Sequence, residues 1–289
     1  MSTLTVDGAG SRPVGQVEPP EAATRRARRR RLWPWRLLGV ALFAVAWQLV
    51  SLLVRSPAVL PGPVEVLGNF AANVDGSPTL EYLGLDVSSY LGNLGYTGSV
   101  VLGGWALGGL VGVVLGLVTA RVQWVRNLTE PVTTVFGVVP VLVAAPFVLV
   151  WFGTSSTGKV LLIAFFTAVT VLVVTQAAAL ALPLRYEEYA ATLGAGRSAA
   201  MRRVLLPATL TTTLTGLRTA LGQAWGLQAV AELLGAPAGI GRAIAVRAGT
   251  GDIASVLALV LALGLVALVC DAALAAVVRR LTRWQTQDN

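Results

Sequence analysis

Histidine is absent from this chain of 289 residues, and cysteine occurs only once, at Cys270. The lack of histidine removes the commonest general base and metal ligand. A single cysteine permits neither a disulfide within the chain nor a metal site built on thiolates. The sequence offers no paired-carboxylate site for acid–base chemistry either. We therefore expect a non-catalytic protein that binds no metal.

Charge is scarce as well, because 12% of residues are charged whereas 55% are hydrophobic and the mean hydropathy is +0.72. A soluble domain has no place for that much apolar surface. A membrane-spanning helix needs about 20 mostly apolar residues. Six such runs occur, at residues 33–54, 97–120, 132–152, 160–183, 208–234 and 254–279. They predict an all-α, polytopic membrane protein with about six transmembrane helices.

The net charge of +8 follows the predicted membrane topology and needs no nucleic-acid partner. With the N-terminus in the cytoplasm, seventeen basic residues fall on the inner side and four on the outer side. Basic residues are enriched in cytoplasmic loops. Both termini and the loop after the fourth run are therefore predicted to be cytoplasmic.

The segments outside the runs complete the expected organisation. Residues 1–32 combine a Gly-, Pro-, Glu- and Ser-rich stretch with an arginine cluster and predict a disordered basic cytoplasmic tail. Residues 55–95 carry too many prolines and acids to cross a bilayer, so we expect an extracytoplasmic segment with short interfacial helices. Residues 96–282 are expected to form the core, with a loop at 184–207. Residues 283–289 form a second cytoplasmic tail.

The loop between the fourth and fifth runs contains the stretch EEYAATLGAGRSAAMRRVLLP at residues 187–207. Its two leading glutamates favour the positive N-terminal end of a helix dipole, and the alanines that follow have high helix propensity. Gly194 suits a helix C-terminal cap, and Pro207 fixes where the next segment starts. The pattern predicts a short exposed helix whose small side chains let a partner approach closely.

The spacing of this stretch resembles the cytoplasmic EAA loop of ABC importer permeases. The matching residues are Glu188, Ala190, Ala191, Gly194, Val204, Leu206 and Pro207. Tyr189 departs from the usual Ala, and Val204 departs from the usual Ile. The alternative is an ordinary connecting loop whose spacing arises by chance.

The resemblance runs from about residue 60 to residue 280 and implies the type I importer permease fold in a bacterial plasma membrane. It also implies a homodimer with the pathway at the subunit interface. Two separate ATPase subunits would bind ATP and Mg, an extracytoplasmic binding protein would deliver the solute, and this chain would bind no cofactor.

Two further passages resemble permeases for sulfonates, taurine and nitrate. VPVLVAAPFVLVWFGTSSTGK at 139–159 matches a Pro-containing third span with a Trp-Phe-Gly turn, and residues 216–244 match an Ala-Glu and Gly-Leu-Gly pattern. Prolines and ionisable residues inside spans mark candidate pathways. The candidates for the translocation path or its gate are Pro140, Pro146, Trp151, Gly153, Arg218, Glu232, Gly239 and Gly241.

Structural alternatives remain open for these candidates. The prolines can form a packing kink away from the pathway, and Arg218 and Glu232 can make hydrogen bonds that hold the bundle together. Fourteen residues separate the two, about 21 Å along a straight helix, so they cannot pair within one helix. Each is expected to meet another span, a second copy of the chain, or water.

Glycines recur at every fourth position of the second run, at Gly104, Gly108, Gly112 and Gly116. Such a stripe lets another helix pack closely, without indicating which helix. Residues 153–159 fit the pattern G-x-x-x-x-G-K of a phosphate-binding loop. Val160, however, stands where that loop needs Ser or Thr, and no preceding strand is expected, so we predict no nucleotide binding by this chain.

These observations favour the membrane permease subunit of an ATP-driven importer for a small solute, with a small anion such as a sulfonate, taurine or nitrate as the expected cargo. The alternative is a secondary transporter or channel that acts alone. That class is expected to show inverted repeats or a relay of intramembrane acids. The sequence shows no clear repeat, and its acids within the runs are few, chiefly Glu232 and Asp271.

Overall fold

The computed structural model describes residues 21–138, 143, 146, 150, 153 and 155–282, and every regular element within these residues is helical. This confirms the predicted all-α class. The chain divides into two units, residues 1–53 and 54–289. The first unit holds nearly all of helix α1 (Glu21–Val54), whose apolar part at 37–54 is long enough to cross a membrane. The helix begins at Glu21, so the arginine cluster is helical here, although it was predicted to lie in a disordered tail.

The long helices of the second unit correspond to the predicted spans. They are α4 (Tyr90–Arg121), α7 (Ser156–Leu180), α10 (Leu206–Leu233) and α12 (Ile253–Leu281). Helix α5 (Gln123–Val138) overlaps the start of the third predicted span, most of which lies outside the described residues. The predicted extracytoplasmic segment contains the short helices α2 (Pro63–Asn73) and α3 (Pro78–Tyr82).

Four described helices are long and apolar enough to cross a membrane, namely α1, α4, α7 and α12. Helix α10 has 28 residues but is not one of these four. Its sequence carries six threonines together with Arg218, Gln223, Gln228 and Glu232. Among the predicted spans that are described in full, α10 is therefore the polar one.

The glycine stripe of α4 packs against α7. A Cβ atom at Gly104, Gly112 or Gly116 would lie 2.7 Å from atoms of α7, and one at Gly108 would overlap the backbone of Ala164. Only glycine allows the two backbones to approach this closely. The structure thus identifies the partner helix that the sequence left open.

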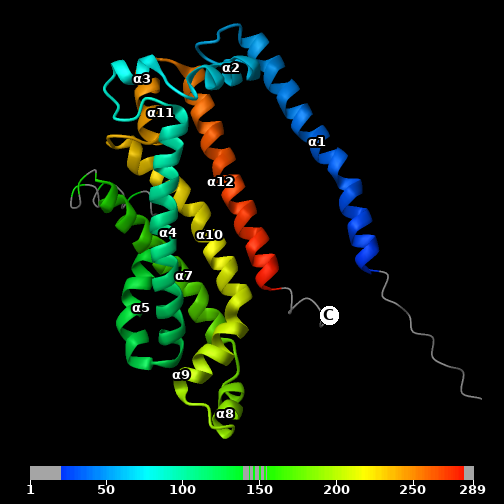
Figure 1. Cartoon of the computed structure of the whole chain (residues 1–289), viewed down its shortest axis with the longest axis vertical. Coiled ribbons are helices and arrows are strands. Elements are labelled where there is room, and N and C mark those ends of the chain that lie inside the picture. Colours follow the sequence, from blue (N-terminus) through cyan, green and yellow to red (C-terminus); the bar gives the residue numbers. More distant parts are fainter. Residues whose placement is uncertain are drawn as a thin grey trace, which may run out of the picture. The chain divides into compact units, whose positions relative to one another are not determined.

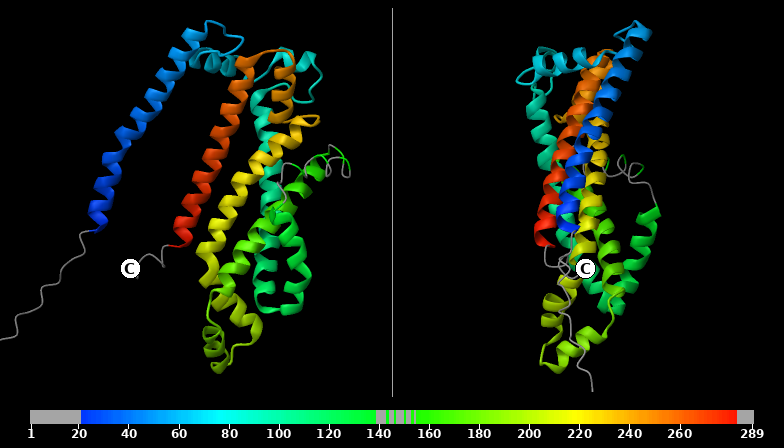
Figure 2. Two further views of the ribbon diagram at one scale, coloured as in Figure 1. Left: turned by 180° about the vertical axis from the view of Figure 1, so that it is seen from behind. Right: turned by 90° about the vertical axis from the view of Figure 1, so that its right-hand side faces the viewer.

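The main hydrophobic core lies where α4, α7 and α10 meet. Val101 and Ile163 are fully buried there, and Trp225 fills the space beside them. Within the second unit, α8 (Arg185–Thr192) and α9 (Arg197–Ala200) lie at one end of the long helices (Figure 1). Helices α2, α3 and α11 (Ile240–Gly249) lie at the opposite end in all views (Figures 1 and 2). The loop at residues 184–207 and the joint between α10 and α11 therefore lie at opposite ends of the same bundle.

Candidate functional site

The loop at residues 184–207, which we call the coupling loop because of its predicted role, begins with the short helix α8, which has no buried residue. Gly194 ends this helix with φ +84°. Its N–H donates to the carbonyl of Ala191, and the N–H of Ala195 donates to the carbonyl of Ala190. These two bonds form a Schellman motif, which confirms the predicted capping role of Gly194.

The tip of α8 exposes large apolar side chains. Leu193 is 88% exposed and Tyr189 is 66% exposed. Apolar side chains that protrude together from a short helix are characteristic of an interaction surface. Tyr189, the residue that departs from the EAA pattern, is part of this surface.

Two connections join α8 to the long helices. Arg121, at the end of α4, donates from Nε to Glu187 Oε1 at 2.6 Å, and its Nη2 lies 2.6 Å from the same oxygen. Helix α9, the π-helical turn η1 (Met201–Leu205) and α10 follow one another without a break. Val204 lies in η1 and Leu206 begins α10; Pro207 lies in the first turn of α10, where it was predicted to mark the start of the next segment. A proline that cannot donate a helical hydrogen bond suits this change of helix type.

Glu232 is fully buried at the end of α10 and caps the start of α11. Its carboxylate accepts hydrogen bonds from the Gly241 backbone N–H at 2.8 Å, from Thr97 Oγ1 at 2.9 and 3.0 Å, and from Gln228 Nε2 at 2.7 Å. Gly239 precedes α11 with φ +114°, and a side chain there would overlap the Glu232 carboxylate. Glu232, Gly239 and Gly241 thus belong to one compact joint between α10 and α11.

Asn93 and Thr97 complete this joint from α4. The Asn93 side-chain oxygen accepts from the Gly239 N–H at 2.7 Å, and Thr97 Oγ1 accepts from the Ile240 N–H at 3.0 Å. The hydrogen bonds of the Glu232 carboxylate described above are all to groups of the protein. They correspond to the structural alternative for Glu232, in which its hydrogen bonds hold the bundle together. Asn93 and Thr97 were not among the site residues predicted from sequence, although their spacing of four places both polar side chains on one face of a largely apolar helix.

Arg218 forms an ion pair with a residue of another predicted span, which is one of the alternatives stated for it. Its Nε donates to Asp271 Oδ1 of α12 at 2.5 Å, and its Nη2 donates to Oδ2 at 2.6 Å. The Arg218 side chain is 50% exposed and that of Asp271 is 34% exposed. Arg218 and Glu232 therefore lie in separate sites.

The exposed surface of α10 differs from that of its neighbours. From residue 208 to residue 226 it consists of Ala208, Thr211, Thr212, Thr215, Arg218, Thr219, Gly222, Gln223 and Gly226. No large apolar side chain is exposed along this part of the helix. Helix α12, by contrast, exposes Leu261, Leu265 and Leu268. We call the exposed set of nine residues the polar face of α10.

The third-span candidates are described only in part. Pro140 and Trp151 lie outside the described residues, Pro146 is helical and exposed, and Gly153 has φ +70°. After this turn Lys159 is fully buried in the first turn of α7, where its Nζ donates to the Tyr96 hydroxyl at 3.4 Å. A fully buried amine of this kind is not open to a phosphate.

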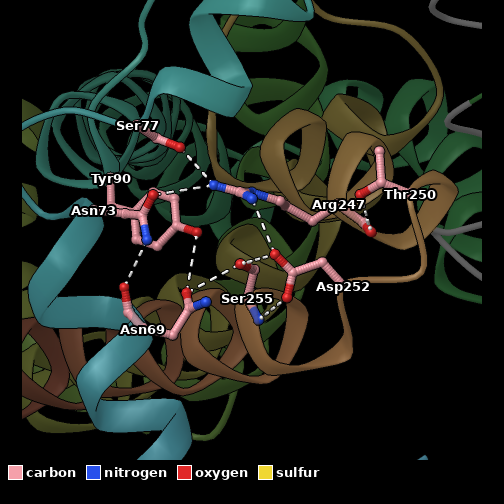
Figure 3. A network of polar contacts seen from close by, with 8 residues as sticks. All are labelled: Asn69, Asn73, Ser77, Tyr90, Arg247, Thr250, Asp252 and Ser255. Carbon is pink, nitrogen blue, oxygen red and sulfur yellow. Dashed lines mark hydrogen bonds and ion pairs between the residues drawn. The ribbon is translucent and has the colours of Figure 1, made fainter. Parts of the chain in front are cut away.

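A polar network centred on Arg247 was not predicted from the sequence (Figure 3). Arg247 is 5% exposed and donates to Asp252 Oδ2 at 2.9 Å, to Ser77 Oγ at 2.5 Å and to Asn73 Oδ1 at 3.1 Å. Ser255 Oγ joins the network through Asp252 and the side chain of Asn69. These contacts tie α2 and the segment before α3 to α11 and α12.

The spacing of Asn69 and Asn73 was the available signal, because residues four apart share a helix face. Arg247, the partner of Asn73, lies 174 residues later in the chain, and Ser255, a partner of Asn69, lies 186 residues later. No local pattern indicates contacts over such separations.

Comparisons with known proteins identify the family of this chain and its relatives. The family described as "Binding-protein-dependent transport system inner membrane component" matches residues 108–283. The riboflavin transport system permease protein RibX of Chloroflexus aurantiacus is 30% identical over 278 residues, which cover 94% of this chain and 97% of the relative. The taurine transport system permease protein TauC of Escherichia coli is 29% identical over 267 residues, covering 89% of this chain and 94% of the relative.

The fold also resembles a solved structure described as an inward facing conformation of the MetNI methionine ABC transporter. The TM-score is 0.58 with 21% sequence identity, and the match covers 71% of this chain and 99% of the other. This likeness concerns the fold alone.

Proposed function

Because the chain belongs to the family of binding-protein-dependent transport system inner membrane components, we propose that it forms the solute path of an ATP-driven importer. It is an ABC transporter permease subunit in a membrane. We further propose that two copies of the chain enclose the path. Two separate ATPase subunits, which carry ATP and Mg, would drive transport. An extracytoplasmic binding protein supplies the solute.

The observation that carries this proposal is the exposed coupling loop. Tyr189 and Leu193 present apolar surface to solvent on a helix that the Schellman motif holds in shape. A soluble ATPase with a groove for this helix would bury that surface. The loop lies at the opposite end of the bundle from α2, α3 and α11, which supports a cytoplasmic loop and an outer segment at residues 55–95 (Figure 1). The arginine distribution supports the same orientation, with both termini in the cytoplasm.

The proposed mechanism is alternating access between inward- and outward-facing arrangements. Binding of ATP would close the ATPase pair and displace α8. The Arg121–Glu187 pair would pass this motion to α4, and α9, which follows α8 after a short turn, would pass it through η1 to α10. Hydrolysis and release would reverse the motion.

We propose that the polar face of α10 lines the path at the interface of the two copies. Threonine, glutamine and arginine side chains are costly against lipid, so this face suits water or a polar solute. Arg218 supports a small anion such as a sulfonate, taurine or nitrate as cargo, because a guanidinium binds oxoanions with several N–H donors. The taurine transport relative agrees with this choice, whereas the riboflavin transport relative belongs to another solute class.

The test of the proposal is the variant Gly194→Val in the purified complex of permease and ATPase. A β-branched residue at φ +84° is strained, so α8 should lose its cap and coupling should fail. We expect the stimulation of ATP hydrolysis by the loaded binding protein to fall by about tenfold or more, while the variant still inserts into the membrane.

The matched control is Gly196→Val, two residues away. Gly196 has φ −70° and ψ 166°, and a Cβ atom there meets nothing within 4 Å, so valine fits without strain. Equal coupling in both variants would reject the role of the loop. Solute uptake by the permease without its ATPase would instead support a transporter that acts alone.

A further inference from the structure

Within the part of the chain that the structure describes, the Arg218–Asp271 pair leaves some of its hydrogen-bonding capacity unused. The guanidinium gives Nε and one Nη2 hydrogen to Asp271, so three N–H donors have no partner among those residues. Among the described residues Asp271 accepts from Arg218 alone, so its carboxylate also retains free lone pairs. Both side chains remain partly exposed.

The surroundings of the pair indicate what can bind the free N–H donors of Arg218 and the free lone pairs of Asp271. Arg218 lies in the middle of the polar face of α10, between Thr215 and Gly222. Hydrocarbon cannot satisfy free donors and acceptors, so this position must face water, a polar ligand or polar groups of the second copy. The threonine hydroxyls beside it already donate within α10: Thr215 donates to the carbonyl of Thr211 and Thr219 to that of Thr215. The charged pair is therefore the most strongly polar group on this face.

We infer that Arg218 and Asp271 form a binding site for a small zwitterion, a solute that carries an oxoanion together with an ammonium group. This inference rests on the proposed transport function and narrows its cargo. The free guanidinium N–H groups would donate to the oxoanion, and the Asp271 carboxylate would accept from the ammonium. A solute with both charges can meet both halves of the pair without separating them.

A simple anion fits the site less well. The pair has no net charge, so its attraction for a lone negative charge is weak. An anion close enough to contact Arg218 also lies close to the Asp271 carboxylate, and like charges in contact are unfavourable. The geometry therefore favours an aminosulfonate over a plain sulfonate or nitrate.

The experiment compares 2-aminoethanesulfonate with ethanesulfonate, which has the same sulfonate and lacks the ammonium. Uptake of each is measured in vesicles containing the complete transporter, with one binding protein used throughout. The wild-type protein is expected to prefer the zwitterion by about tenfold. Asp271→Asn keeps the shape of the side chain and removes its charge, so this preference should fall at least about fivefold, chiefly through faster uptake of ethanesulfonate.

Two further variants make the result specific. The double variant R218Q/D271N keeps the site uncharged and should show no preference between the two solutes. Asp86→Asn removes an exposed carboxylate in the segment before α4 and should keep the wild-type ratio. A wild-type ratio near one, or an unchanged ratio in Asp271→Asn, overturns the inference.

The outcome also separates this inference from the proposed function. If the binding protein stimulates ATP hydrolysis but neither sulfonate is taken up, the zwitterion site is rejected and the importer assignment stands. If the ATPase does not couple to this chain at all, the proposed function itself fails.

Discussion

At the scale of single residues, the glycines of α4 decide how closely two helices approach. Gly108 and Gly103 lie on the same helix in different surroundings. A Cβ atom at Gly108 would overlap the backbone of Ala164 in α7, whereas one at Gly103 meets nothing within 4 Å. Backbone atoms cannot move aside as a side chain can, so the first position requires glycine and the second does not.

We therefore predict that Gly108→Val destabilises the protein and that Gly103→Val is tolerated. Valine at position 108 should push α4 and α7 apart and cost about 3 kcal/mol or more, the upper range for overpacking. Thermal unfolding of the purified variants in detergent, followed through the loss of monodisperse protein, measures the difference. Equal melting temperatures for the two variants would contradict the close packing of α4 on α7.

Residue-scale features were predictable from sequence when the physics was local. The cap at Gly194 followed from a helix-forming stretch that ends in glycine, and the structure contains that cap. The partners of Arg218 and Glu232 were not predictable, because they depend on which helices become neighbours. Asp271, the partner of Arg218, lies 53 residues later in the chain. Glu232 contacts the N-terminus of α11 because the chain turns back before Gly241, with Gly239 at φ +114°.

At the scale of elements, α10 differs from the other long helices in what it exposes. Its small and polar residues alternate with a buried face that carries Leu221, Trp225 and Leu227. A helix with an apolar buried face and a polar exposed face within a membrane protein borders water or protein instead of lipid. The low apolarity of α10 therefore has a functional explanation.

Cysteine labelling tests this property of α10, because Cys270 is the only native cysteine and Cys270→Ala removes it. Thr215→Cys and Thr219→Cys place thiols on the polar face. We expect both to react with a membrane-impermeant thiol reagent in the assembled transporter, since a thiol must meet water to ionise. The control Leu265→Cys lies on the exposed apolar surface of α12 and should react at least about tenfold more slowly.

Labelling of Leu265→Cys as fast as the two threonine positions would remove the distinction between the helices. Protection of both threonine positions would place the polar face against protein, away from the path. A change in their labelling rate when ATP is added would further link this face to the transport cycle.

At the scale of the whole molecule, composition and hydropathy predicted the helical class and the approximate spans. The helices α4, α7, α10 and α12 cover the corresponding predicted runs within a few residues, except that α4 begins seven residues early, at Tyr90. The segment at residues 55–95 contains short helices, as predicted. Its attachment through Arg247 was not predicted, because the network joins residues from Asn69 to Ser255 that no local pattern connects.

The two ends of the second unit have distinct tasks in this account. The end with α8 and α9 exposes a surface for a motor protein, and the end with α2, α3 and α11 is held together by the buried Arg247 network. Between them lies the polar face of α10, which we propose as the lining of the path. The central claim is that this chain provides the solute path and the surface to which the ATPase subunits bind. The chain depends on those separate subunits for energy.

Uptake into vesicles that contain the chain with or without its ATPase subunits is the most direct measurement of that claim. With the ATPase, the loaded binding protein and ATP present, we predict accumulation of radiolabelled 2-aminoethanesulfonate against its gradient. Vesicles that contain the chain alone should show no uptake above that of protein-free vesicles. Accumulation by the chain alone, or by the full assembly without ATP, would contradict the account.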